Sequence, residues 1–142
     1  MPIIKGIAFV GFMVSAIALL TNGIAYLAAH KIMSYHCEAI GKSWDELPSG
    51  TQIMSLCFMK SAAAGMLSTG IAMVMLLIFP YRSGELWSEI AVSLIAMLES
   101  GILASRVAIV RKRTKGCPPL TLSILLFAVT IISTLFTIIG RA

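Results

Sequence analysis

Four long runs of apolar residues constrain the fold of this chain more than any other feature of its sequence. A helix needs about 20 apolar residues to cross a hydrocarbon layer of roughly 30 Å. The runs cover residues 3–29, 53–79, 86–110 and 120–139, and they take up most of the 142 residues. The sequence therefore predicts an all-α fold, an integral membrane four-helix bundle that forms a single domain over residues 1–142.

The composition excludes other classes of protein. Hydrophobic residues make up 58% of the chain and charged residues 12%, whereas soluble domains carry about half and about a quarter. A disordered chain needs low hydrophobicity, and three cysteines form at most one disulfide bridge. The first run is much longer than the apolar core of a cleaved signal, so we expect it to be a permanent helix.

The loop between the first two runs, residues 30–52, carries a start signal for a short helix. Ser43 and Glu46 have the spacing of a capping box, in which two side chains satisfy free backbone N–H groups. We expect a short interfacial helix here, with Trp44 as its anchor among the lipid headgroups. Pro80 is expected to end the second span, and a tight turn to lead into the third.

The basic residues predict an orientation. Loops one and three share a membrane face and carry six lysines and arginines, whereas the other face carries three. Because cytoplasmic loops are enriched in these residues, we expect these two loops in the cytoplasm and both termini outside. The net charge of +5 is explained by anionic lipid beside the spans, so we expect no nucleic-acid partner.

Three charged residues, Lys60, Glu99 and Arg106, lie more than one turn inside the predicted spans, where charge is costly and typical of functional sites. The first hypothesis is a structural cluster in which the acid pairs with a neighbouring base. The second is a hydrated pocket that opens to the basic face and includes polar residues of the first helix. The candidate ligand-binding residues are Asn22, Tyr26, His30, Lys60, Glu99 and Arg106.

Catalytic and metal-binding patterns are weak. His30, His36, Cys37 and Glu38 offer the right atoms for zinc or copper, but their spacing matches no common metal motif. No spacing typical of a serine hydrolase, a zinc protease or a phosphate-binding loop occurs. We therefore expect no catalytic residues, no metal and no cofactor.

Two loop segments carry a resemblance. Residues 33–36 (MSYH), continuing to Trp44 and Leu47-Pro48, and residues 80–87 (PYRSGELW) resemble a family of small uncharacterised bacterial four-helix membrane proteins that is loosely DoxX-like. The resemblance implies a bundle in the bacterial inner membrane. It adds weight to candidate interface residues, although an ion pair within the turn and plain interfacial anchors explain several of them equally well. These residues are His36, Trp44, Arg82, Glu85 and Trp87.

The leading functional hypothesis is a non-catalytic accessory or assembly subunit of a larger bacterial inner-membrane complex. It rests on small residues spaced along the helices, which allow close helix packing, and its expected partners are membrane lipids and other membrane subunits. The alternative is a pocket for a lipid or quinone, or a small proton-coupled carrier that uses Glu99 and Lys60. A membrane enzyme with His36 or Glu99 as its acid or base is the third hypothesis.

Overall fold

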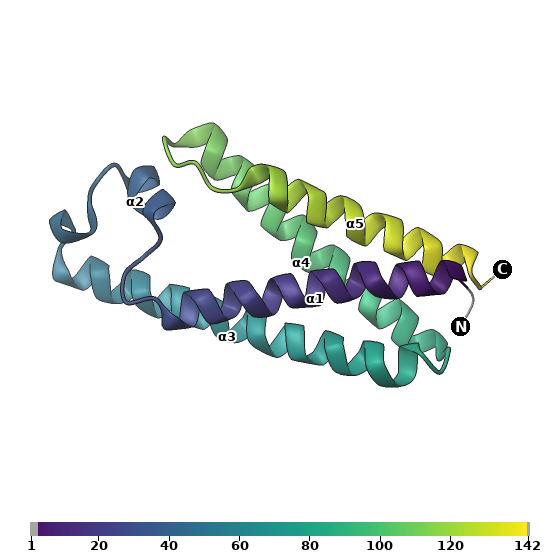
Figure 1. Cartoon of the computed structure of the whole chain (residues 1–142). Helices are drawn as coiled ribbons and strands as arrows, with labels where there is room; N and C mark the ends of the chain where they lie inside the picture. Colours follow the sequence, from purple (N-terminus) through teal and green to yellow (C-terminus); the bar gives the residue numbers. More distant parts are fainter. Residues whose placement is uncertain (1–2, 142) are drawn as a thin grey trace.

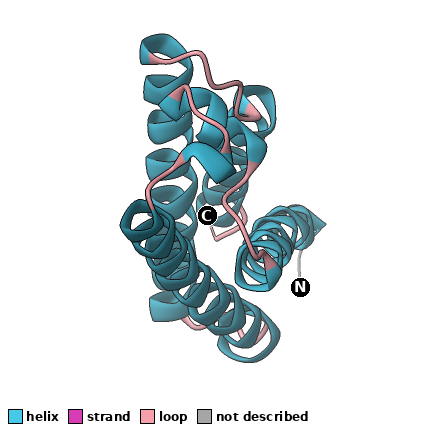
Figure 2. Cartoon of the chain, turned by 90° about the vertical axis from the view of Figure 1, so that its left-hand side faces the viewer, coloured by secondary structure: helices cyan, strands magenta, loops and turns pink. Residues whose placement is uncertain are grey.

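The computed structural model describes residues 3–141, and every regular element in that range is helical (Figures 1 and 2). The four long helices are α1 (Ile3–Ala28), α3 (Ser49–Leu76), α4 (Leu86–Arg113) and α5 (Leu120–Ile139). The first loop holds α2 (Ser34–Ile40) and a 3-10 turn, η1 (Trp44–Glu46). A π turn, η2 (Leu77–Tyr81), continues α3. The predicted all-α fold is confirmed.

All four long helices are long and apolar enough to cross a membrane, which fits a multi-pass membrane protein. Their bounds agree with the predicted spans to within one residue except at three ends: α3 starts early and stops three residues early at Leu76, and α4 continues three residues further to Arg113. Helix α3 begins at Ser49, four residues before the predicted start. The cause is local, because the amide of Gln52 in its first turn donates hydrogen bonds to the carbonyls of Trp44 (2.9 Å) and Leu47 (3.1 Å).

The helices form two pairs. Helix α1 packs against α3 and α5, and α4 packs against α5, whereas α3 and α4 make few contacts although a short turn joins them. The pairs converge at the end that holds both termini and separate toward the end that holds α2 (Figure 1). Gly70 marks a close approach within the first pair, because a Cβ there would lie 2.8 Å from Leu20 of α1. Small residues permit such contacts in lipid.

The main core lies at the converging end. Phe12, Met73, Leu77, Tyr81 and Val92 are buried there with small alanines of α1 and α4. The tyrosine hydroxyl and the Thr137 hydroxyl share a hydrogen bond of 2.8 Å, so the one polar group of this large side chain is satisfied. A smaller cluster lies under the first loop at the separating end.

The first loop differs in detail from the prediction. The Ser43 and Glu46 capping box is present, with the Ser43 N–H donating to the Glu46 carboxylate at 2.8 Å. It starts a single 3-10 turn, because Pro48 follows two residues after Glu46 and cannot continue a helix. The longer interfacial helix is α2, which the sequence analysis did not predict and which ends at Gly41 with a left-handed φ of 76°.

Candidate functional site

The candidate site is a groove of about 430 Å³ between the diverging helices α3 and α4. Glu99 lies on its wall, thirteen residues after the first residue of α4 and fourteen before the last. At about 1.5 Å per residue, its carboxyl is about 20 Å from either end of that helix. The groove therefore presents an acid at the middle of the span. Its lining residues are Ser68, Thr69, Ala72, Ile95, Leu98 and Glu99.

Glu99 has no charged partner within residues 3–141, because both ion pairs in that range involve a different carboxylate. No hydrogen bond to its side chain forms in that range either. A charge at the centre of a bilayer costs at least about 3 kcal/mol when nothing compensates it. Whatever fills the groove therefore meets an acid that the chain itself leaves without a counter-charge.

Lys60, the predicted neighbour of Glu99, lies elsewhere. Its ammonium donates a 2.9 Å hydrogen bond to the carbonyl of Leu27 at the end of α1. Ser68 faces Glu99 across the groove, and Lys60 is eight residues earlier on α3, which is about 12 Å along the axis. Arg106 is exposed two turns beyond Glu99 on α4. The structure does not bring these three ionisable residues together.

The predicted polar residues of α1 also lie apart from the groove. Asn22 is exposed, and its amide donates to the carbonyl of Ala18 in its own helix at 2.8 Å. The Tyr26 hydroxyl forms a short hydrogen bond with the hydroxyl of Tyr35 in α2. His30 is exposed at the start of the first loop. The single cavity that was expected to unite these residues with Glu99 does not form.

His36 belongs to an aromatic cluster that holds α2 against α1. Its ring centroid lies 4.3 Å from that of Tyr35 and 6.2 Å from that of Tyr26, in edge-to-face geometry. Burial lowers the pKa of His36, which favours a neutral imidazole at pH 7. Burial and the hydrogen bond with Tyr26 raise the pKa of Tyr35. The cluster is a hydrogen-bonded anchor between two helices.

The ion-pair network of the chain was missed by the sequence analysis. The Glu89 carboxylate, only 3% exposed, accepts hydrogen bonds from Lys5 Nζ at 2.7 Å and from Arg141 Nη1 at 2.9 Å. These three residues tie α1, α4 and the end of α5 together at the converging end. A signal was present in the sequence, because the predicted topology puts the start of the third span, with Glu89, at the same membrane face as Lys5 and Arg141.

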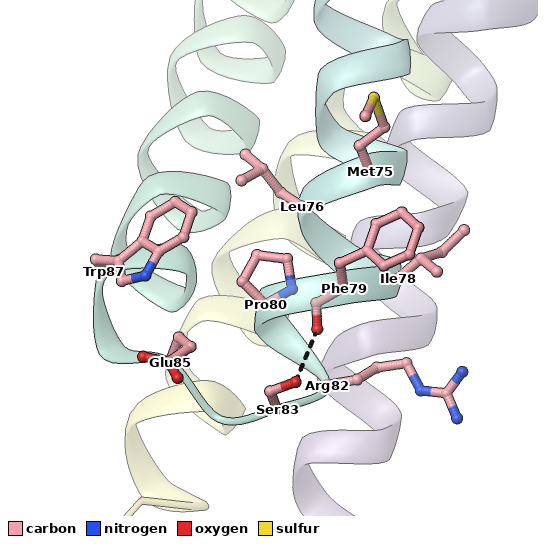
Figure 3. A pocket seen from close by; sticks show the side chains of 9 residues that line it. All are labelled: Met75, Leu76, Ile78, Phe79, Pro80, Arg82, Ser83, Glu85 and Trp87. Carbon is pink, nitrogen blue, oxygen red and sulfur yellow. Dashed lines mark hydrogen bonds between the residues drawn. The ribbon is translucent and has the colours of Figure 1, made fainter.

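A second groove, of about 820 Å³, lies at the turn between η2 and α4 (Figure 3). Arg82 and Glu85 belong to its wall and form no ion pair with each other or with any residue in the range 3–141. The ion pair within the turn, which was one of the two interpretations of Arg82 and Glu85, is therefore absent from the described residues. Trp87 is 57% exposed at the edge of this groove, whereas Trp44 packs against the small cluster under the first loop.

Comparison with known proteins found no relative of this chain. No family model, no curated protein and no solved structure matches this chain. The resemblance to the DoxX-like group stays a prediction. Within residues 3–141, no three histidine, cysteine, aspartate or glutamate side chains come close enough to hold a metal ion.

Proposed function

We propose that this multi-pass membrane protein is a non-catalytic accessory or assembly subunit of a larger complex in the bacterial inner membrane. It acts by receiving a transmembrane helix of a partner subunit in the groove between α3 and α4. The observation that carries the proposal is Glu99, an acid at mid-span on the wall of an open groove, with no counter-charge within residues 3–141.

The face of α3 that includes Ser68 and Ala72, two residues of the groove wall, suits a helix. Ser61, Gly65, Ser68 and Ala72 follow one another at spacings of three or four residues, so they share one face of α3, and all four are exposed. A Cβ added at Gly65 would meet nothing within 4 Å. Since helices in lipid associate through small residues that allow close backbone approach, this face is available to a helix from outside the chain.

Glu99 specifies the chemistry of the partner. An acyl chain provides no hydrogen bond to a carboxyl, so lipid alone would leave it uncompensated. A helix with a lysine, arginine or amide side chain at mid-depth would supply the missing donor, and such contacts are worth about 0.6 to 2 kcal/mol in membranes. The partner is therefore expected to carry a small-residue face with one polar side chain near its centre.

A second candidate function is a pocket for a lipid or quinone, or a small proton-coupled carrier. The observation in its favour is that the same groove contains the two hydroxyls of Ser68 and Thr69 beside Glu99. In this version Glu99 acts without Lys60, because the lysine is about 12 Å further along the bundle and donates to the Leu27 carbonyl.

The test uses three single variants in native membranes. Ala72→Leu adds bulk at an exposed residue that lines the groove, Glu99→Gln removes the acid at nearly constant volume, and Ala25→Leu adds the same bulk at an exposed site on α1. After extraction in mild detergent, native electrophoresis separates complex from free chain. We expect the first two variants to release the chain, while Ala25→Leu leaves the complex intact.

Two results would contradict the proposal. The first is that the wild-type chain migrates only as a free monomer. The second is that the complex survives both groove variants. A photo-cross-linker at Ser68 separates the remaining readings. An adduct with another membrane protein supports the accessory role, an adduct with a second copy replaces it with self-association, and an adduct with lipid or quinone alone favours the second candidate.

A further inference from the structure

The groove at the turn between η2 and α4 combines an apolar floor with charges of both signs. Met75, Leu76, Ile78 and Phe79 provide the apolar wall, and Pro80 lies between them and the start of α4 (Figure 3). The remaining residues that line the groove are Arg82, Ser83, Glu85 and Trp87. Arg82, Ser83 and Glu85 all belong to the turn directly beyond the apolar part of the span.

The two charged side chains are free to bind something else. Arg82 and Glu85 are both exposed, and neither belongs to an ion pair within residues 3–141. In Figure 3 the Arg82 side chain extends away from Glu85, so the guanidinium and the carboxylate stand apart. Trp87, beside them, is the residue type enriched at the level of the lipid headgroups.

We propose that this groove binds a phospholipid with a zwitterionic headgroup that ends in a primary ammonium, as in phosphatidylethanolamine. The exposed Arg82 side chain turns toward Glu85 on binding, so that its guanidinium binds the phosphate while the carboxylate of Glu85 binds the ammonium. An acyl chain lies over Phe79 and Met75. This site goes beyond the proposed docking of a partner helix and does not rest on it, because it binds lipid at the surface end of the span.

The side chains present favour this headgroup over the other common ones. A guanidinium binds phosphate through two parallel hydrogen bonds. A primary ammonium has three N–H donors, and the acceptors here are the Glu85 carboxylate and the Ser83 hydroxyl, whose own proton goes to the carbonyl of Phe79 at 3.2 Å. A quaternary ammonium has no donor. A headgroup with only negative charge would lie against Glu85 without compensation.

The test is competition among lipids. The purified full chain is placed in nanodiscs with equal amounts of phosphatidylethanolamine, phosphatidylcholine and phosphatidylglycerol, and native mass spectrometry counts the lipids retained. We expect ethanolamine lipid to exceed choline lipid by roughly threefold to tenfold, the size expected for one or two partly exposed charged contacts. Glu85→Gln should bring this ratio close to one. Arg82→Gln should lower the retention of all three lipids.

Arg111→Gln is the matched control, because Arg111 is an exposed basic residue at the opposite end of α4. It should change neither quantity. A wild-type ratio near one overturns the inference whatever the variants do, and so does a preference for phosphatidylglycerol. An unchanged ratio in Glu85→Gln removes the ammonium site. None of these outcomes depends on a partner helix, so the proposed function is judged separately.

Discussion

Glu89 offers the sharpest test of how this chain is held together. The substitution Glu89→Gln keeps the volume of the side chain and removes its charge. Because the carboxylate is 3% exposed and accepts from Lys5 and Arg141 at 2.7 and 2.9 Å, two charge-assisted hydrogen bonds become neutral ones. Hydrogen bonds to charged groups contribute about 1.5 to 3 kcal/mol and neutral ones about 0.5 to 1.5 kcal/mol.

The two bonds are not equal. The Lys5 side chain is 12% exposed and that of Arg141 is 42% exposed, so water screens the second pair, and exposed pairs contribute at most about 1 kcal/mol. Most of the loss therefore comes from the Lys5 pair. We expect Glu89→Gln to lower the free energy of unfolding by about 2 kcal/mol, and Arg141→Gln to lower it by less than about 1 kcal/mol.

The assay is reversible unfolding in mixed micelles with increasing dodecyl sulfate, followed by the loss of tertiary signal. Glu99→Gln is the matched control, since it removes a carboxylate from the same helix with no ion pair within residues 3–141, and it should leave the stability unchanged or raise it. Equal effects of Glu89→Gln and Glu99→Gln would refute the assignment of stability to the buried ion pairs.

Three further predictions follow from other parts of the structure. Gly70→Ala should destabilise the chain by about 1 to 3 kcal/mol because its Cβ meets a leucine of α1 at 2.8 Å, whereas Gly65→Ala, which meets nothing, should not, in the same unfolding assay. Because burial lowers the pKa of His36, the unfolded chain binds more protons near pH 6 than the folded chain does. The free energy of unfolding should therefore fall as the pH drops below 6.5. An NMR titration that gives a pKa of His36 at or above 6.5 would contradict this. The predicted orientation can be tested with an impermeant maleimide on right-side-out vesicles. A chain whose one cysteine is Cys117, in the predicted cytoplasmic loop, should stay unlabelled, whereas a chain whose one cysteine is Ser83→Cys should react. The reverse pattern would invert the predicted orientation.

The spans could be predicted because they depend on length and hydropathy alone. Their start points could not, because polar residues such as Gln52 extend α3 into the loop by bonding to it. The sequence was sufficient to predict that Ser68 and Glu99 lie level with each other. The turn is centred between Ser83 and Gly84, and counting fifteen residues in each direction reaches these two positions. The same count places Lys60 level with residue 107, which is why it cannot meet the acid.

Glu89 shows what hydropathy leaves out. Its partners are 84 and 52 residues away in the sequence, and their meeting depends on how α1, α4 and α5 rotate about their axes. A count of apolar residues does not fix helix rotation. The same limit explains the failure of the single polar cavity, since hydropathy does not show that Asn22 is exposed and donates to the Ala18 carbonyl of its own helix.

The two carboxylates of α4 have opposite roles. Glu89 and Glu99 are ten residues apart, so they point to different sides of the helix. Glu89 is buried with two cations and holds the converging end closed, whereas Glu99 lies where α3 and α4 separate and has no charged partner within residues 3–141.

An acid at the position of Glu99 does not help the chain to fold in lipid. Glu99→Leu should therefore keep or raise the stability of the isolated chain, because it removes an uncompensated polar group from the span. The same substitution should release the chain from its complex. If Glu99→Leu instead destabilises the isolated chain as much as Glu89→Gln does, the acid belongs to the fold and the docking proposal loses its main support.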